Sequence, residues 1–536
     1  MADRYPASSR PMSSPSRSRR STLRIALIAI AGAMSLLAAA DAVAQIRVGP
    51  GNPAGPLAND PIISRPTTIG PIGNGPIGRL GPRLPPPEID MPGNIRPYGP
   101  VVIDNLDDYR RRIGAVRRGT VRIRPTRQIA QSQQTVARGG FNAPPPGETR
   151  FVPNEVLLNI APSAANATLN ALARLHHLTR LESSDLALTR RRLLRWRIND
   201  GRPVAVVIRA LQADPRVVGA VLGAQPNYLY ALQEDAAAAK PDPAPVQTDS
   251  AQYALAKLHL TEAHAIAKGE NVVIAVIDTP IDATHPELAG VITATFDATG
   301  AADKPLPHGT GMASAIAAHG KLIGSAPNVK LISVAAFGRV RTQGTTFNIV
   351  KGLDWAANAN ANIINMSFAG PADPELAAML ASARAKGLVL IAAAGNAGPT
   401  SPPLYPAADP NVIAVTATDI DDRLFERANR GAYIAVAAPG VNILVAAPDG
   451  GYQTTSGTSV AAAEVSGIAA LMIERNRKLD PASVRRVLMS TAHDLGPAGP
   501  DDQFGAGLTD ALGALTALDA KPASLPQVSG PPTPAP

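Results

Sequence analysis

The sequence has 536 residues, of which 45% are hydrophobic, enough for one large domain and a smaller one. It contains no cysteine, which excludes disulfides, thiol nucleophiles and cysteine-ligated zinc. The net charge of +9 is unevenly placed: residues 1–250 carry 32 Lys and Arg against 18 Asp and Glu, whereas residues 251–536 carry 19 against 24. This split argues against one basic face for nucleic acid, so we expect no nucleic-acid partner and two parts of complementary charge.

Residues 1–44 are predicted to be a signal peptide. An apolar run at 25–40, short for a membrane span, follows Arg10, Arg17, Arg19, Arg20 and Arg24, and Ala42-Val43-Ala44 forms a small-x-small cleavage pattern. The segment Ser18–Arg24 also resembles a twin-arginine export signal, although Thr22 stands where that pattern usually has an aromatic residue. We expect an exported protein, periplasmic or secreted, by the twin-arginine or the general route. No stable membrane span is expected after signal removal; an uncleaved anchor is the alternative.

Residues 45–150 are predicted to be a basic, Pro/Gly-rich linker without a fixed structure. Residues 45–100 contain 14 prolines and 10 glycines, and such a composition cannot pack a core. A polyproline segment that binds a partner is the alternative. The Pro-rich tail at 521–536 is likewise predicted to be disordered.

Residues 151–232 are predicted to form a small α+β domain, because short apolar patterns of two kinds alternate there. The predicted strands are 156–160, 193–198 and 217–222, and the predicted helices are 164–178 and 203–213. Since neighbouring helical residues point about 100° apart, we expect His176 and His177 to lie at the surface and to share no metal. The Ala/Pro/Asp-rich segment 233–252 is predicted to be an exposed connector.

Residues 253–520 are predicted to form a large α/β domain. The runs at 272–277, 330–335, 363–366, 388–393 and 412–416 are continuously apolar, and helical patterns at 347–359 and 374–386 lie between them. Such strands are typical of a mostly parallel sheet covered on both faces. In these sheets chemistry collects at the carboxyl ends of the strands.

Four polar residues stand at places where chemistry is expected. Asp278 ends an apolar strand, Asn396 follows another, and His308 precedes a Gly/Thr turn and a helix predicted at 312–318. Ser459 opens a nearly uninterrupted apolar run that reads as a buried helix. Each has an ordinary alternative, since Asp and Asn favour turns and Ser favours helix N-caps. Together they supply a nucleophile, a base, an acid to orient the base and an oxyanion donor.

The chain order Asp, His, Asn, Ser, in the local sequences Val-Ile-Asp-Thr, His-Gly-Thr, Ala-Ala-Gly-Asn and Gly-Thr-Ser, resembles the subtilisin family of serine peptidases. The resemblance covers residues 252–518. It implies a subtilisin-like three-layer fold and a serine endopeptidase that acts on protein or peptide substrates. In it, Asp278, His308 and Ser459 form the triad and Asn396 holds the oxyanion. The implied substrate-binding residues are Ser367, Phe368, Ala369, Gly370, Ala393, Ala394 and Gly395.

The same resemblance implies that the small domain, including Pro226-Asn227-Tyr228, is a propeptide that serves as chaperone and inhibitor. We expect self-cleavage between Leu232 and Gln252. Because the two implied substrate-binding segments lack acidic side chains, we also expect an apolar or uncharged residue before the cleaved bond. No cofactor is expected, and calcium stays open because Asp419, Asp421, Asp422, Asp501 and Asp502 form no recognisable ligand loop.

Some positions depart from the family pattern. Pro280 stands where Gly is usual after Asp-Thr, and its fixed φ and missing N–H could alter the turn that holds Asp278. Glu464 stands where His is frequent, and we expect it to face away from Ser459 and to meet an Arg or water. The main alternative is a catalytically inactive subtilase-fold binding or scaffold protein. A lipase or esterase is disfavoured because residues 457–461 lack the second Gly of Gly-x-Ser-x-Gly.

Overall fold

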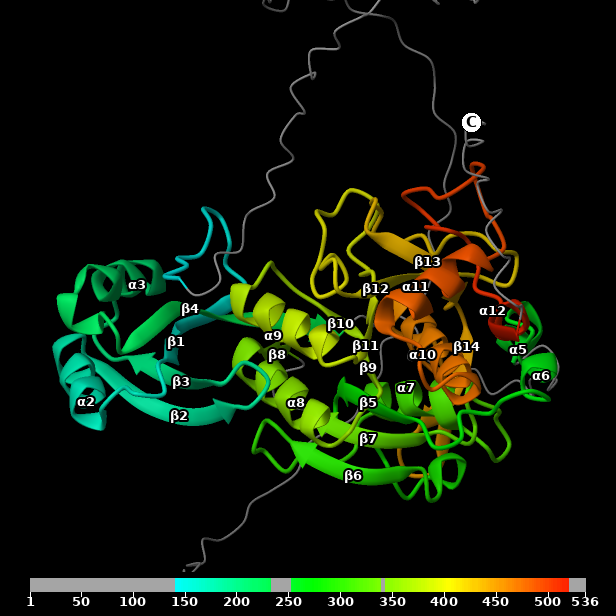
Figure 1. The fold of residues 1–536 in the computed structure, drawn as a ribbon, viewed down its shortest axis with the longest axis horizontal. Helices are drawn as coiled ribbons and strands as arrows, with labels where there is room; N and C mark the ends of the chain where they lie inside the picture. Colours follow the sequence, from blue (N-terminus) through cyan, green and yellow to red (C-terminus); the bar gives the residue numbers. More distant parts are fainter. Residues whose placement is uncertain (1–139, 233–251, 339–342, 520–536) are drawn as a thin grey trace, which may run out of the picture. The chain divides into compact units, whose positions relative to one another are not determined.

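We describe the protein from a computed structural model, which describes residues 140–232, 252–338 and 343–519 (Figure 1). The predicted signal peptide, residues 45–139 of the predicted linker, the connector at 233–251 and the tail from residue 520 lie outside these ranges. Within the described ranges, no helix is both long enough and apolar enough to cross a membrane.

The small unit is a four-stranded antiparallel sheet with two helices on one face (Figure 1). Its elements are β1 (Phe151–Ile160), α2 (Asn166–Leu175), β2 (Leu178–Leu186), β3 (Arg191–Ile198), α3 (Val204–Ala213), the 3₁₀ turn η1 (Pro215–Val217) and β4 (Val221–Leu232). Alternate residues of β1 serve different cores: Val156 and Leu158 pack under α2 and α3, whereas Leu157 packs against the large unit. The period of two in a strand therefore lets one sheet bury both faces.

The first helix of the small unit is shorter than the predicted range 164–178. It ends at Leu175, and β2 begins at Leu178, a strand that the sequence patterns did not predict. His176 caps the helix, is buried, and contacts Asp214 with Nε2 and Oδ2 2.9 Å apart. The surface location expected for His176 is therefore wrong, whereas His177 is exposed.

The large unit is built on seven parallel strands in the order β13-β12-β11-β9-β5-β7-β6 (Figure 1). Their bounds are β5 Val273–Asp278, β6 Ile292–Asp297, β7 Lys330–Ala335, β9 Ile363–Met366, β11 Val389–Ala393, β12 Ile413–Thr418 and β13 Ile434–Pro439. This confirms the predicted α/β class with a mostly parallel sheet. The strands β7 and β9 have the predicted bounds.

Helices cover both faces of this sheet and make a three-layer domain. The helices α7 (Pro307–Ala317) and α10 (Thr458–Arg475) pack on one face, and α8 (Thr346–Asn358) and α9 (Pro374–Ala385) pack on the other. The remaining elements are α5 (Tyr253–Lys257), α6 (Leu260–Ala263), the 3₁₀ turn η3 (Pro286–Leu288), β8 (Gln343–Thr345), β10 (Phe368–Ala369), the hairpin β14 (Ile443–Ala447) with β15 (Gly451–Thr455), α11 (Pro481–Ser490) and α12 (Ala511–Asp519).

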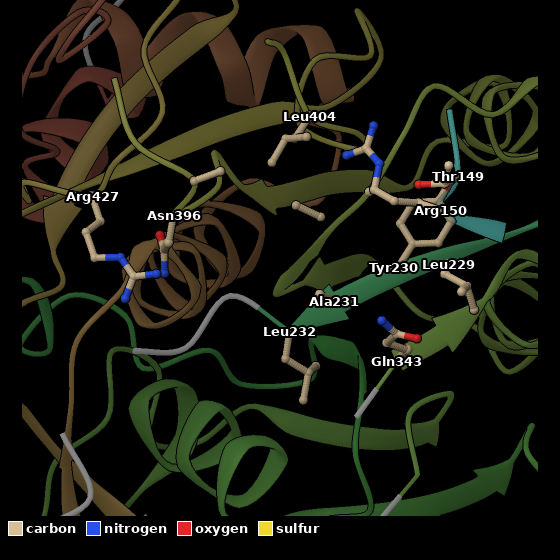
Figure 2. A pocket seen from close by; sticks show the side chains of 13 residues that line it. Thr149, Arg150, Leu229, Tyr230, Ala231, Leu232, Gln343, Asn396, Leu404 and Arg427 are labelled. Atoms are coloured by element: carbon tan, nitrogen blue, oxygen red, sulfur yellow. The ribbon is translucent and has the colours of Figure 1, made fainter. Parts of the chain in front are cut away.

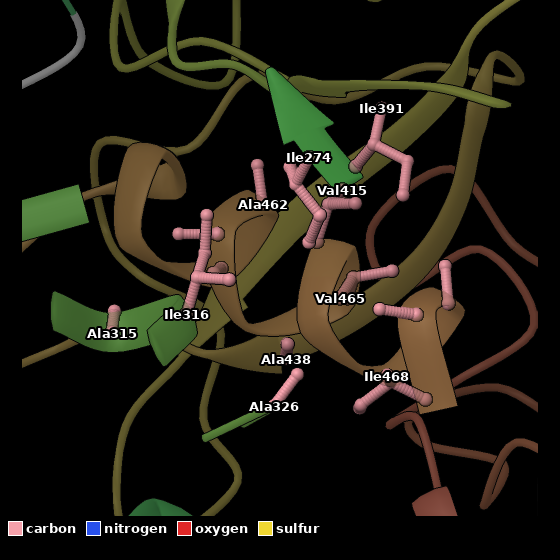
Figure 3. Packing of buried hydrophobic residues seen from close by; sticks show 14 of the residues in the cluster. Ile274, Ala315, Ile316, Ala326, Ile391, Val415, Ala438, Ala462, Val465 and Ile468 are labelled. Carbon is pink, nitrogen blue, oxygen red and sulfur yellow. The ribbon is translucent and has the colours of Figure 1, made fainter. Parts of the chain in front are cut away.

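Helix α10 lies in the middle of the larger hydrophobic core. Residues 458–473 are all buried, and Ala462, Val465 and Ile468 pack among side chains of the sheet, α7 and neighbouring loops (Figure 3). A helix surrounded in this way needs apolar side chains on all sides, which explains why its sequence shows no polar stripe. The core thus holds the start of α10 in a fixed position.

Candidate active site

The predicted site residues gather at one edge of the large sheet. Strands β11, β9 and β5 are neighbours, and at their carboxyl ends stand Asn396, Ser367 and Asp278. Helices α7 and α10 pack against each other and carry His308 and Ser459 in their first turns. The strand-end rule for parallel sheets therefore brings the predicted residues together at one edge.

His308 is fixed by Asp278. The ring Nδ1 lies 2.7 Å from Oδ1 and 2.9 Å from Oδ2 of Asp278, and both side chains are buried. The N–H of Thr279 also donates to Oδ1 at 2.7 Å. An Asp carboxylate on Nδ1 orients the imidazole and leaves Nε2 as the atom for proton transfer.

Helix α7 begins earlier than predicted, at Pro307 rather than at residue 312. A proline at the first helical position is favourable because its missing N–H has no partner to lose there. In the sequence, the glycines at 309 and 311 suggest a turn, so the pattern does not indicate that a helix starts here. Gly309 is required by packing, since a Cβ there would lie 2.4 Å from the carbonyl oxygen of Thr279.

Pro280 does not displace Asp278. Its carbonyl oxygen accepts a hydrogen bond of 2.9 Å from the N–H of Leu306, the residue just before α7. The turn after β5 is thus tied to the start of the helix that carries His308. The disturbance considered for this turn is not seen, because the Asp278–His308 contact is made with Pro280 in place.

Ser459 is the second residue of α10 and not its cap. The N-cap is Gly457, whose φ of 155° is a conformation that residues with a side chain rarely adopt. The hydroxyl of Ser459 donates to the carbonyl oxygen of Ser367 at 3.2 Å, and the Ser367 hydroxyl donates to the carbonyl oxygen of Ser459 at 3.0 Å. Further hydrogen bonds from Asn365 to Ser367 and from Ser466 to Asn365 complete a buried network that ties α10 to β9.

Asn396 is oriented by the residue next to Ser459. Its side-chain oxygen accepts from the N–H of Thr458 at 3.1 Å and from the Thr458 hydroxyl at 2.8 Å. The amide NH₂ group therefore lies on the side away from Thr458, and Asn396 lines a pocket there (Figure 2). Gly395 is needed in this segment because its φ is 114° and a Cβ would lie 2.9 Å from the Asn429 amide nitrogen.

The predicted substrate-binding segment 367–370 borders a strand of the small unit. Beyond its own sheet, β4 pairs antiparallel with both β10 and β8. The facing pairs with β10 are Leu232 with Phe368 and Ala231 with Ala369. The other predicted substrate-binding segment, 393–395, is held by the large sheet, because the N–H of Ala394 donates to the carbonyl oxygen of Val415 in β12. Strand β8 was not predicted from the sequence. Its clearest sequence signal is Gly344, because a Cβ at that position would lie 2.7 Å from the Phe337 ring.

Tyr230 anchors β4 between these strands. Its ring is buried and meets the Phe368 ring edge-on, with centroids 5.8 Å apart. Its hydroxyl donates to Oδ2 of Asp373 at 3.1 Å, and burial raises the pKa of the Tyr230 hydroxyl well above its usual range. Gly370 makes room for the ring, because a Cβ there would lie 2.5 Å from Tyr230 Cδ1.

Two buried carboxyls also join the small unit to the large one. Asp373, the N-cap of α9, accepts from Gln225 at 2.7 Å, and Glu375 accepts from Asn159. Burial raises the pKa of both carboxyls. These contacts therefore join amide and hydroxyl donors to buried acids. Lys351 of the large unit pairs with Glu182 of the small unit at 2.5 Å. In this pair the base belongs to the large unit and the acid to the small one, the reverse of what the net charges of the two halves suggest.

Glu464 is buried in α10 and contacts Ser325. Burial raises the pKa of its carboxyl from 4.5 to about 8, so the group is largely neutral at pH 7. Its Oε2 atom has no hydrogen-bond partner among the described residues. The contact of this carboxyl is the Ser325 hydroxyl and not the Arg considered from the sequence.

Glutamine at position 464 is expected to flatten the pH dependence of stability. A carboxyl with a raised folded pKa contributes its full stability below about pH 4.5 and loses it as the pH rises to about 8. In a Ser459→Ala background, which prevents autolysis, Glu464→Gln should raise the melting temperature at pH 9 by several degrees relative to its effect at pH 4. The exposed Glu262→Gln is the control. Equal pH profiles with and without Glu464 would contradict this expectation.

Among the described residues, no group of three or more His, Asp or Glu side chains is placed to hold a metal ion. Asp419 accepts instead from the N–H groups of Asp421 and Arg423, and from the Arg423 guanidinium at 2.8 Å.

Comparison with known proteins agrees with this fold. The family model described as "Subtilase family" matches residues 269–507. Subtilisin DY from Bacillus licheniformis is 36% identical over 244 residues, which cover 43% of this chain and 86% of that protein. Thermitase from Thermoactinomyces vulgaris is 33% identical over 258 residues, which cover 47% of this chain and 91% of that protein.

A solved structure shares the architecture. Fervidolysin from Fervidobacterium pennivorans, a keratinolytic enzyme related to subtilisin, superposes with a TM-score of 0.58 at 22% sequence identity. The match covers 70% of this chain and 63% of that one. The fold is therefore the subtilisin-like three-layer α/β fold. The chain belongs to the subtilase family of serine-type endopeptidases.

Proposed function

We propose that this protein is an exported endopeptidase in which Ser459 is the nucleophile, His308 the general base, Asp278 the residue that orients it, and Asn396 an oxyanion donor. The observation that carries the proposal is the His308–Asp278 contact at 2.7 Å, made at the same sheet edge at which Ser459 begins α10. A buried carboxylate on Nδ1 favours the tautomer whose Nε2 can accept a proton.

The proposed reaction follows from these positions. His308 Nε2 accepts the Ser459 hydroxyl proton as Oγ attacks the peptide carbonyl carbon, and the C=O π pair moves to the oxygen. The Asn396 NH₂ group and the Ser459 N–H donate to that oxyanion, and the first turn of α10 adds its positive dipole end. His308 then gives the proton to the leaving nitrogen as the C–N bond breaks, and water hydrolyses the acyl-enzyme by the same steps.

We further propose that the small unit is a propeptide whose strand β4 occupies the substrate groove. It pairs with β8 and β10 through main-chain hydrogen bonds, as an extended substrate would by strand addition. Leu232 faces Phe368 in this antiparallel pair, so Ser367, the residue before Phe368, lies one position beyond Leu232. The carbonyl oxygen of Ser367 accepts a hydrogen bond from the Ser459 hydroxyl. A peptide in this register would present to Ser459 the bond that follows the residue after Leu232. In this chain that bond joins Gln233 and Glu234, inside the range expected for self-cleavage.

Export is part of the proposal and depends on the N-terminal sequence pattern. The pattern fits both the twin-arginine route and the general export route. The inactive-scaffold alternative was based on Pro280 and on the long Pro/Gly-rich linker, and the contact between His308 and Asp278 argues against the first of these.

The test is incubation of purified, processed protein with casein, together with N-terminal sequencing of the processed chain. We expect casein fragments and a mature chain that begins at Glu234. A protein purified in folded form that leaves casein and its own precursor intact would contradict the proposed function.

A further inference from the structure

The side chain of Tyr230 leaves the small unit and is buried against the large one. In the register of β4 with β8, Tyr230 faces Gly344. Its ring meets the Phe368 ring edge-on, and Gly370 provides the space for it, since a Cβ at Gly370 would lie 2.5 Å from Tyr230 Cδ1. These three contact residues belong to the peptidase, so they remain when a propeptide leaves.

The hydroxyl of Tyr230 meets acceptors at the far end of this site. It lies 3.1 Å from Oδ2 of Asp373 and 3.4 Å from the carbonyl oxygen of Pro371. Both groups belong to the large unit, and both accept hydrogen bonds. A side chain in this site is therefore apolar along its ring and needs a donor at its tip, and among aromatic side chains a phenol places its O–H there.

Asp373 is held in place by the large unit alone. As the N-cap of α9 it accepts from the N–H groups of Glu375 at 2.9 Å and Leu376 at 3.1 Å, and its Oδ2 also accepts from the Thr346 hydroxyl at 2.6 Å. When the small unit leaves, Asp373 loses the Gln225 amide and the phenol and keeps these three donors. A fixed acceptor that has lost donors favours a ligand that supplies one again.

We propose that Asp373 is a specificity-determining residue that selects tyrosine over phenylalanine at the substrate position that Tyr230 occupies. This inference rests on the proposed function, in which β4 lies in the groove as a substrate strand would. In the proposed register, this position is the third before the residue whose carbonyl is attacked, because Leu232 faces Phe368. It is separate from the apolar or uncharged residue expected immediately before the cleaved bond.

The test on processed wild-type enzyme uses quenched peptides of the sequence Xaa-Ala-Leu-Gln-Glu, which follows residues 230–234. Xaa is Tyr, Phe or 4-fluorophenylalanine, whose fluorine occupies the place of the hydroxyl but cannot donate. The Tyr peptide should have a kcat/KM about 10-fold higher than either of the others, because only its side chain pairs with the carboxylate. Equal values for Tyr and 4-fluorophenylalanine would overturn the inference, and so would a preference for Lys over Tyr.

The variant Asp373→Asn converts the acceptor into a donor with little change in size. Its side-chain oxygen can keep the cap of α9, while the NH₂ group replaces Oδ2. The Tyr/Phe ratio should fall to about 1 because the phenol has lost its acceptor. An unchanged ratio would contradict the role of Asp373. The wild-type series decides by itself if this variant does not mature.

The matched control is Glu375→Gln, which removes the neighbouring buried carboxyl. Glu375 accepts from Asn159 of the small unit and not from Tyr230, so the processed variant should keep the wild-type Tyr/Phe ratio. A preparation that cleaves casein but none of the peptides would overturn the inference alone. A folded, processed preparation that cleaves neither would overturn the proposed function and the inference with it.

Discussion

The Ser459→Ala variant should accumulate as an uncut precursor, and its rate of peptide hydrolysis should fall at least ~10⁴-fold. Without the hydroxyl there is no acyl-enzyme, so both self-cleavage and turnover stop. In subtilisin itself, removal of the nucleophile costs on the order of 10⁶ in kcat, and the remaining rate comes from the oxyanion donors and binding. The measurement is gel analysis of purified precursor over time, followed by casein hydrolysis.

A serine three residues earlier provides the control. The Ser456 hydroxyl accepts from the N–H of Asn442, and within the described ranges it forms no hydrogen bond with the four proposed catalytic side chains. Ser456→Ala should be processed at close to the wild-type rate. If purified Ser459→Ala were cut at the same position and rate as wild type, self-processing through Ser459 would be wrong.

The Asp278→Asn variant is expected to process itself about 10⁴-fold more slowly. An amide NH₂ group facing Nδ1 favours the tautomer in which Nε2 carries the proton, so His308 cannot accept the proton of Ser459. The shape of the site is kept, since Asn and Asp are nearly equal in size. The first-order rate at which the precursor disappears measures the effect without requiring mature enzyme.

Pro280→Gly is the companion variant for Asp278. The carbonyl group that accepts from Leu306 remains, so the contact between His308 and Asp278 should persist and the processing rate should stay within about twofold of wild type. A loss as large as that of Asp278→Asn would show that the proline holds the turn. A normal rate in Asp278→Asn would remove Asp278 from the mechanism.

The sequence predicts the central sheet and the gathering of the candidate site residues at one edge because both depend on local patterns. Strands β7 and β9 are continuous apolar runs, and they begin and end where predicted. Asp278 and Asn396 stand at the ends of such runs, so the rule for parallel sheets brings them to one edge. The start of α7 is missed because glycines at 309 and 311 resemble a turn, although Gly309 is a packing requirement in a buried helix.

Features that depend on distant contacts are not predicted. The strand β8 has three residues and is stabilised by pairing with β4, which lies more than a hundred residues earlier in the chain. Asp373 looks like an ordinary helix N-cap until the fold brings it to Tyr230, 143 residues away in the sequence. Glu464 is buried because α10 is enclosed on all sides. The apolar pattern of the sequence indicates this enclosure, but it does not reveal which polar group Glu464 contacts.

The buried acids Asp373 and Glu375 change the view of how the two units are held together. Net charge suggested attraction between a basic and an acidic part, but these carboxyls are enclosed and accept from Gln225 and Asn159. Enclosed carboxyls with raised pKa values favour the assembled state at lower pH, and this preference is lost as the pH rises through those values.

Covalent labelling with a fluorophosphonate tests most directly whether Ser459 is an activated nucleophile. Processed wild-type protein should take up one equivalent, and peptide mapping should find it on Ser459, because phosphorus accepts the attack that the peptide carbonyl otherwise receives. His308→Ala precursor, cleaved in trans by a trace of wild-type enzyme, should label far more slowly. Label on another residue, or no label on folded, processed protein, would contradict the account.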